Sequence, residues 1–241
     1  MRLGVFDSGV GGLTVVREIQ GLYSELIYLG DTARAPYGTR TEAEIAQFGE
    51  ESLRFLLKEN PNAIVIACNT VSAVAGQELK RLSPIPVYGM IETVVSEVEP
   101  KTGRIVVLGT NATVRSGAYE LALKEKGFGE VLSIACSDLV EIVESGEKDQ
   151  KAIWSVLDRY LSPIKGGNYD AVVLGCTHFP VLGDQISEYT GLPVVKSGEG
   201  LRKILTQKET KSEQFFVSGD IAHFTKVGSR ILGREVVPRK A

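Results

Sequence analysis

Cys68 stands where the apolar run AIVIA gives way to Asn69 and Thr70, two residue types that commonly cap helices. A thiol at a helix N-terminus lies in the partial positive charge of the helix, which favours the thiolate. The pattern therefore predicts a cysteine that acts as a base or a nucleophile. A lone cysteine is as often a small buried hydrophobic residue, so Cys68 by itself leaves both roles open.

The same arrangement recurs in AVVLGCTHFPVL, where Cys176 is followed by Thr177 and His178. Thr177 can cap the next segment, and a histidine beside a thiol is typical of an acid–base pair or a metal site. Because the chain has three cysteines and two histidines but no CxxC or HxxxH spacing, we expect no metal. A disulfide between Cys68 and Cys176 is allowed by count, but so few cysteines favour a reducing compartment.

Paired thiols suit one reaction in particular. If Cys68 and Cys176 flank one cleft, one thiolate can remove an α-proton from one face of a substrate while the other thiol returns a proton to the opposite face. Racemisation needs this geometry. A nucleophilic hydrolase needs only one thiol, with a base and oxyanion donors.

Three further segments carry side chains that could bind a substrate. FDSGVGGL has glycines that let backbone N–H groups approach an anion, with Asp7 and Ser8 beside them. GDTARAPYGTRT contains Tyr37 and Gly38, and GTNATVRSGAY places Thr113 after another apolar run. The glycines do not fit a dinucleotide or phosphate-loop spacing, and plain turns or helix caps remain alternatives for each segment.

The elements that must position these residues alternate between strand and helix patterns. Runs rich in Val, Ile and Leu predict strands at residues 2–7, 26–31, 63–68, 86–90, 104–110, 171–176 and 192–197. Helical periodicity predicts helices at residues 41–59, 70–82, 116–126, 151–162 and 181–189. Such alternation predicts parallel sheets that bind ligands at the carboxyl ends of their strands.

The chain also echoes itself, because GVFDSG followed by AIVIACNT resembles VVLGTNAT followed by AVVLGCTH. We therefore predict an α/β fold of two similar parallel-sheet domains that face each other, with the active site in the cleft between them. The polar stretch SEVEPKTG, at the end of a boundary region near residues 91–101, separates the halves. The expected first domain is residues 1–92 plus about 205–241, and the second is residues 93–204.

Composition excludes several partners. Hydrophobic residues make up 43% of the chain and the net charge is −3, with no basic stripe, so neither nucleic acid nor an anionic membrane is expected. No apolar stretch is long enough for a membrane span, and MRLGVFDSG does not match a signal peptide. We expect a cytoplasmic protein with a small-molecule substrate, and a homodimer as a candidate oligomeric state.

Five segments in order, DSGVGGLTV, GDTARAPYGTR, ACNTVSA, GTNATVRSGAY and LGCTHFP, resemble the motifs of the glutamate racemase family. The resemblance continues to FFVSGDIAHFTKVGSRILG at the end of the chain. It implies interconversion of L- and D-glutamate without pyridoxal phosphate, metal or any other cofactor. It also implies a role in supplying D-glutamate for bacterial peptidoglycan. The sequence departs from the family pattern at Phe179 and Lys196, and it lacks a proline expected after Cys136.

The resemblance also implies roles for individual residues. Cys68 and Cys176 match the two proton-transfer residues, and Asp7, His178 and Glu144 match groups that assist them. The substrate-binding positions are matched by Asp7, Ser8, Tyr37, Gly38, Asn69, Thr70, Thr113, Thr177 and His178.

Three alternatives remain at this point. The nearest is a racemase of another acidic amino acid, such as aspartate. The second is a cysteine-dependent hydrolase or acyl transferase built on Cys176 and His178. The third is a two-domain binding protein for an amino acid, which would have no need of paired thiols.

Overall fold

The strands form two parallel sheets in a computed structural model that describes residues 1–99, 103–206 and 209–241. Sheet A, in the order β10-β9-β2-β1-β3-β4, consists of β1 (Arg2–Asp7), β2 (Glu25–Gly30), β3 (Ala63–Ile66), β4 (Val87–Gly89), β9 (Ser212–Val217) and β10 (Pro238–Lys240). Sheet B, in the order β6-β5-β7-β8, consists of β5 (Arg104–Gly109), β6 (Glu130–Ala135), β7 (Ala171–Gly175) and β8 (Val194–Val195).

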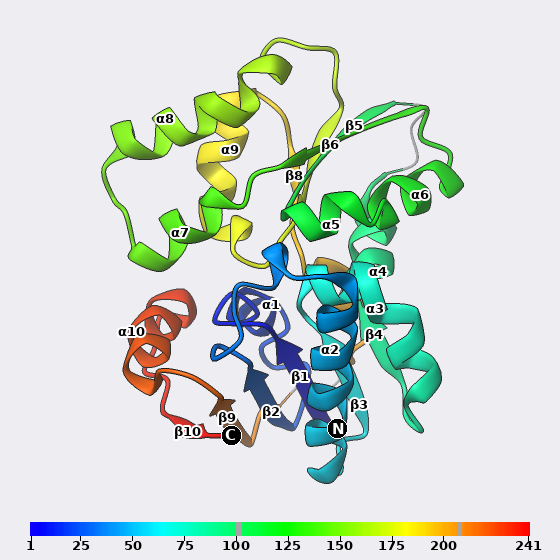
Figure 1. Ribbon diagram of the computed structural model, residues 1–241, viewed down its shortest axis with the longest axis vertical. Helices are drawn as coiled ribbons and strands as arrows, with labels where there is room; N and C mark the ends of the chain where they lie inside the picture. Colours follow the sequence, from blue (N-terminus) through cyan, green and yellow to red (C-terminus); the bar gives the residue numbers. More distant parts are fainter. Residues whose placement is uncertain (100–102, 207–208) are drawn as a thin grey trace.

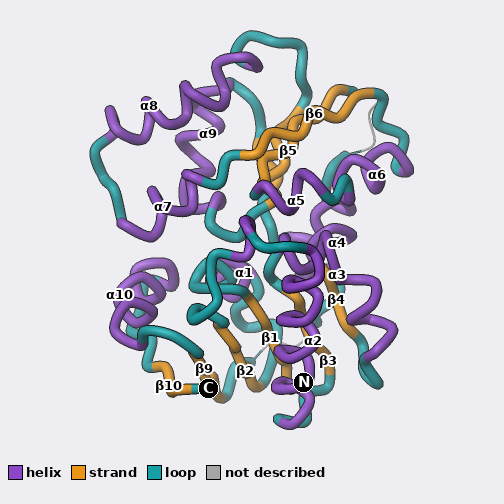
Figure 2. The backbone as a smooth tube through the Cα atoms, viewed as in Figure 1, coloured by secondary structure: helices purple, strands orange, loops and turns teal. Residues whose placement is uncertain are grey.

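Helices cover both sheets. They are α1 (Leu13–Glu18), α2 (Glu42–Lys58), α3 (Asn69–Leu82), α4 (Met90–Glu97), α5 (Asn111–Arg115), α6 (Ala118–Glu125), α7 (Asp138–Ser145), α8 (Gln150–Leu161), α9 (Gly183–Thr190) and α10 (Ile221–Leu232). Short 3-10 helices include η1 (Tyr37–Thr39), η3 (Phe179–Leu182) and η4 (Glu199–Lys203). Figure 2 shows the strands running between helices in each unit. None of the described helices is long and apolar enough to cross a membrane.

The two sheets share a strand order. The run β2-β1-β3-β4 in sheet A corresponds to β6-β5-β7-β8 in sheet B, with β9 and β10 added only to sheet A. The prediction of two similar parallel-sheet halves is confirmed. Figure 1 shows the unit built on sheet B above the unit built on sheet A, with the arrowheads of β1 and β2 directed towards it.

The chain passes from sheet A to sheet B after α4 and returns after η4. The predicted boundary region near residues 91–101 is mostly helix α4, whereas residues 100–102 lie outside the described part of the chain. Because β9 pairs with β2, the C-terminal segment completes sheet A. We propose domain boundaries at residues 1–92 with about 205–241, and at 93–204, which this strand membership supports.

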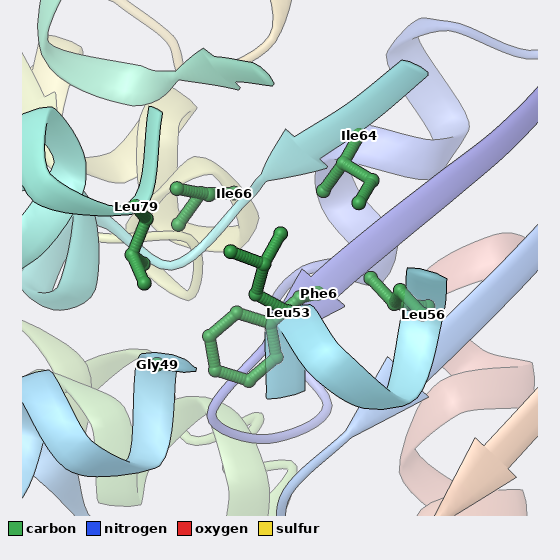
Figure 3. A pocket seen from close by; sticks show the side chains of 7 residues that line it. All are labelled: Phe6, Gly49, Leu53, Leu56, Ile64, Ile66 and Leu79. Carbon is green, nitrogen blue, oxygen red and sulfur yellow. The ribbon is translucent and has the colours of Figure 1, made fainter. Parts of the chain in front are cut away.

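Apolar packing holds sheet A against α2 and α3. Helix α2 begins with a capping box in which Thr41 and Glu44 satisfy each other's backbone N–H groups. Figure 3 shows an apolar gap beneath it that has no room for a water molecule. Its lining residues are Phe6, Gly49, Leu53, Leu56, Ile64, Ile66 and Leu79. This gap is core, where each large apolar side chain contributes about 1.5–3 kcal/mol, and it carries no chemistry.

Candidate active site

The predicted site residues gather where the carboxyl ends of the two sheets meet. Asp7 ends β1, and Cys68 follows β3, while Cys176 directly follows β7 of the other sheet. The sheets touch here, because Thr14 Oγ1 donates a hydrogen bond of 2.7 Å to the carbonyl oxygen of Thr177. Parallel sheets therefore place both cysteines at one junction, as the strand pattern predicts.

Cys68 caps the start of α3 without a side-chain cap hydrogen bond, and it is only 4% exposed. Its thiol donates to Ser8 Oγ at 3.3 Å. Burial and the charge of Asp7 raise the pKa of the Cys68 thiol to about 12, although hydrogen bonds from Ser8 and the backbone oppose this rise. The expectation of a thiolate favoured by the helix is therefore wrong for this state, because desolvation outweighs the helix charge.

Asp7 links the two cysteine segments. Its Oδ1 accepts a hydrogen bond of 2.8 Å from the backbone N–H of Gly9, and its Oδ2 accepts one of 3.2 Å from Thr177 Oγ1. Asp7 is fully buried, and burial raises the pKa of its carboxyl group against the opposing effect of His178. One carboxylate thus contacts the neighbour of Cys176 while its charge acts on Cys68.

Cys176 lies at the inner end of a chain of acid–base groups. Its Sγ is 3.9 Å from His178 Nδ1, and His178 Nε2 is 2.9 Å from Glu144 Oε1. An ionised carboxylate only accepts hydrogen bonds, so Nε2 is the donor and Nδ1 faces the sulfur. Burial lowers the pKa of His178, but hydrogen bonds and charges from Cys176 and Glu144 raise it to about 10 overall. The same hydrogen bond acts in the opposite direction on its partner, because it lowers the pKa of Glu144.

Asn69 and Thr70 do not cap α3 as predicted, because the chain already turns into the helix at Cys68. Both side chains instead reach across to residues of the other unit. Asn69 Oδ1 accepts a hydrogen bond of 2.5 Å from Tyr119, and Asn69 Nδ2 donates one of 3.2 Å to Ser197 Oγ.

The hydroxyl of Thr70 joins a buried cluster with two threonines that follow β5. Thr70 Oγ1 is 2.9 Å from Thr110 Oγ1 and 3.3 Å from Thr113 Oγ1. Thr110 also caps α5 by accepting from the backbone N–H of Thr113, as one of the predicted alternatives for this segment requires. The cluster brings hydroxyls from both units together, two residues along the chain from Cys68.

Tyr37 and Gly38 lie at this junction for different reasons. The ring of Tyr37 is buried against Phe48, and its hydroxyl donates to the buried carboxylate of Asp31. Asp31 also accepts from Arg34 Nε at 2.5 Å, so it anchors the loop that carries η1. A Cβ on Gly38 would lie 2.8 Å from Thr110 Cβ, so only glycine permits this approach of the two units.

Gly11, in the loop after β1, permits a second close approach. A Cβ on Gly11 would lie 2.5 Å from both His178 Cε1 and Thr177 Oγ1, closer than real side chains come. The glycine-rich loop was predicted as an anion site, and the structure gives Gly11 a further reason to lack a side chain. The backbone of one unit packs directly on the acid–base residues of the other.

Several residues of the junction were missed by sequence reasoning. Tyr119, Ser197 and Asp31 make buried contacts with predicted residues, and His223 binds Glu144 Oε2 at 3.3 Å. Tyr119 and Asp31 lie in the quoted segments GTNATVRSGAY and GDTARAPYGTRT, so their motifs offered a signal, whereas Ser197 and His223 contact residues far away in the chain.

The third cysteine shares an apolar cluster with Cys176, but its thiol hydrogen-bonds to backbone carbonyl oxygens. Cys136 is buried after β6, and its thiol contacts the carbonyl oxygen of Gly109 at 3.8 Å. All three cysteines are free thiols. Within the described residues, no group of three or more His, Cys, Asp and Glu side chains is arranged to hold a metal ion.

We expect Asp7→Asn to stabilise the fold at about pH 7, by on the order of 1 kcal/mol, while it impairs the site. Burial raises the pKa of Asp7 above the ordinary aspartate value of 3.8. The stability that the protonated carboxyl contributes is therefore complete below that value and is lost as pH rises through the raised pKa. Urea unfolding of both proteins at several pH values tests this. The difference in free energy of unfolding between the variant and the unmodified chain should vanish towards about pH 3. A difference that is equal at every pH would contradict this prediction.

Comparison with known proteins identifies close relatives. The family model for Asp/Glu/Hydantoin racemase matches residues 14–201. A glutamate racemase from Aquifex aeolicus (strain VF5) is 40% identical over 248 residues, covering 99% of this chain and 97% of the relative.

Solved structures agree with this assignment. A glutamate racemase isoform from Bacillus anthracis has a TM-score of 0.93 at 33% identity, covering 99% of this chain and 96% of that one. The glutamate racemase of Francisella tularensis subsp. tularensis SCHU S4, solved in complex with D-glutamate, has a TM-score of 0.91 at 31% identity. That match covers 100% of this chain and 97% of the other.

Proposed function

Because this chain belongs to the Asp/Glu/hydantoin racemase family, we propose that it interconverts L- and D-glutamate by passing the α-proton between Cys68 and Cys176. Membership makes the chain an amino-acid racemase, which is an isomerase. Similarity to glutamate racemases along nearly the whole chain supports glutamate as the substrate.

The observation that carries the mechanism is the meeting of the two cysteine segments around Asp7. In one direction, the thiolate of one cysteine takes the α-proton, so that a C–H bond breaks and an S–H bond forms. The thiol of the other cysteine then gives its proton to the opposite face of the same carbon. The reverse direction exchanges the two roles, and no net proton is consumed.

Burial makes the thiolate scarcer but also a stronger base, since a raised pKa means a greater affinity for protons. The α-proton of an amino acid is very weakly acidic, so the site must also stabilise a carbanion-like transition state with fixed donors. His178 and Glu144 assist Cys176, and Asp7 and Ser8 assist Cys68.

The substrate-binding roles follow the same proposal. Donors for the two carboxylates of glutamate come from groups at the junction of the two units. They are the hydroxyls of Thr70, Thr113 and Thr177, the amide of Asn69, and the loop at Tyr37 and Gly38. We further propose that the product supplies peptidoglycan synthesis and that the enzyme works in the cytoplasm without a cofactor. A homodimer remains a proposal for its assembly.

Incubation of the chain with L-glutamate and no added cofactor tests the proposal directly. We expect the circular dichroism signal to decay to zero as D-glutamate accumulates, and deuterium to enter the α-position in heavy water. Aspartate, assayed in parallel, should react at least about 100-fold more slowly, because a site built for one carboxylate spacing leaves polar groups unpaired with a shorter one.

Each rival gives a different result. Faster racemisation of aspartate would identify a racemase of that amino acid. Burst release from an activated ester with a trapped acyl-enzyme would favour a hydrolase built on Cys176. Binding of glutamate without deuterium entry would indicate a binding protein.

A further inference from the structure

The two oxygens of the Glu144 carboxylate are held by two different histidines. His178 Nε2 lies 2.9 Å from Oε1, and His223 Nε2 lies 3.3 Å from Oε2. The chain contains two histidines in all, so both of them meet on one carboxylate. The mechanism described above uses His178 and leaves His223 without a role.

These residues form a path from the buried thiol towards solvent. Cys176 is 6% exposed, whereas the side chain of His223 is 45% exposed. Between them, Glu144 is one-third exposed on the last turn of α7, where water competes with His223 for Oε2. A carboxylate with one oxygen engaged can turn about its terminal torsion, whereas one held at both oxygens cannot.

His223 reaches Glu144 from the opposite unit of the molecule. It lies in the first turn of α10, which follows β9 of sheet A, whereas α7 belongs to the unit of sheet B. The two helices are neighbours in Figure 1, and Arg230 of α10 donates to the carbonyl oxygens of Val143 and Glu144. A Cβ on Gly146 would collide with the Arg230 guanidinium, so glycine at the end of α7 leaves room for it.

We propose that His223 is a positioning residue that fixes the Glu144 carboxylate from the opposite unit, so that Glu144 holds His178 in place for proton transfer at Cys176. This inference rests on the proposed function for its effect on catalysis. The contact of the two units, through α10 and α7, then completes the group that assists one of the two thiols.

The charged groups around His223 are consistent with this role. Glu144 faces it from α7, and Asp220 accepts its backbone N–H at 3.1 Å. Arg230, on the same helix, is directed at the carbonyl oxygens of α7. The hydrogen bond from His178 lowers the pKa of Glu144 most, burial opposes it, and contacts with His223 lower it further.

Kinetics of His223 variants tests the proposal. We expect His223→Ala to lower kcat about three- to tenfold in both directions while KM for glutamate changes less than about twofold. His223→Gln keeps a donor near Oε2 and should recover at least half of the loss on a logarithmic scale. Lys226→Ala, at an exposed position one turn further along α10, is the matched control and should leave kcat unchanged. An unchanged kcat in His223→Ala, or no recovery with glutamine, would overturn the proposal.

A double-mutant cycle separates action through Glu144 from a general effect on the helix. Once Glu144→Gln has removed the carboxylate, adding His223→Ala should lower kcat by less than about twofold further. If His223→Ala instead lowers kcat by the same factor, about three- to tenfold, in the unmodified chain and in Glu144→Gln, then His223 does not act through Glu144.

Nuclear magnetic resonance of the imidazoles gives a readout that does not depend on activity. With two histidines in the chain, His223→Ala leaves a single set of imidazole signals, which belongs to His178. Because Glu144 helps to raise the pKa of His178 to about 10, a loosened carboxylate should move its titration midpoint to lower pH.

An unchanged midpoint would refute the positioning role. If the unmodified chain did not racemise glutamate, the proposed function would fail, yet this measurement would still decide whether His223 positions Glu144.

Discussion

Replacing either Cys68 or Cys176 with serine is expected to lower kcat for racemisation of glutamate by about 1,000-fold or more. A hydroxyl at the same position is a far weaker acid than a thiol, so it supplies neither the base nor the proton donor. The substitution changes one buried atom, so glutamate should still bind with a Kd within about tenfold of the original. Circular dichroism on both enantiomers measures the rate, and calorimetry measures the affinity.

Cys136→Ala is the matched control for these variants. Cys136 is a third buried thiol whose hydrogen bonds run to backbone carbonyl oxygens, so its removal should leave kcat within about twofold and affect mainly stability. Either single-thiol variant can still remove the proton from the enantiomer that faces its remaining sulfur. Residual deuterium exchange should therefore be confined to one enantiomer in Cys68→Ser and to the other in Cys176→Ser. Normal turnover in either variant would reject the two-thiol mechanism.

Gly11→Ala is expected to lower kcat by about 100-fold, although the change adds one methyl group. That methyl would lie 2.5 Å from both His178 Cε1 and Thr177 Oγ1. The neighbours are side chains held by hydrogen bonds at the contact of the two units, His178 to Glu144 and Thr177 to Asp7, so the loop or the other unit must shift by roughly 1 Å. Displacements of that size at reacting groups typically cost two orders of magnitude in rate, which steady-state assays would detect.

Gly76→Ala supplies the comparison for Gly11→Ala. Gly76 lies inside α3, and a Cβ there would meet only Ser72 Cβ, at 4.0 Å. Alanine should keep kcat and stabilise the helix by about 0.5–1 kcal/mol, read as a higher melting temperature. If Gly11→Ala were as active as Gly76→Ala, the close approach around His178 would not constrain the reaction.

The sequence alone predicts the parallel core well, because its buried strands are nearly continuous in apolar residues. The expected strand at residues 104–110 is β5 (Arg104–Gly109), and the one at residues 171–176 is β7 (Ala171–Gly175). The edge strand β6 is missed because it is partly exposed, and β9, between β10 and β2, is missed because it begins with the polar residues of SEQFFV. Helix α4 (Met90–Glu97) is not among the predicted helices, because its last two residues begin the polar stretch SEVEPKTG, which is assigned to the boundary between the halves.

The sequence also predicts some features of the site and not others. Cys68 and Cys176 could be placed at one junction because each follows a strand, and parallel strands end at the same edge. Contacts between distant segments, such as His223 with Glu144, leave no local pattern in the chain. The raised pKa of Cys68 also depends on burial by the folded protein, which a helix N-terminus considered alone cannot reveal.

The two thiols have unlike partners, since Ser8 and Asp7 act on Cys68 whereas His178 and Glu144 form the chain behind Cys176. Mirror-image molecules have equal free energies, so thermodynamics forces kcat/KM to be the same for the two enantiomers of a racemase substrate. The unlike groups around the two thiols therefore cannot make racemisation more efficient in one direction than in the other. Their asymmetry should appear as kcat and KM values that differ between the enantiomers and rise or fall together.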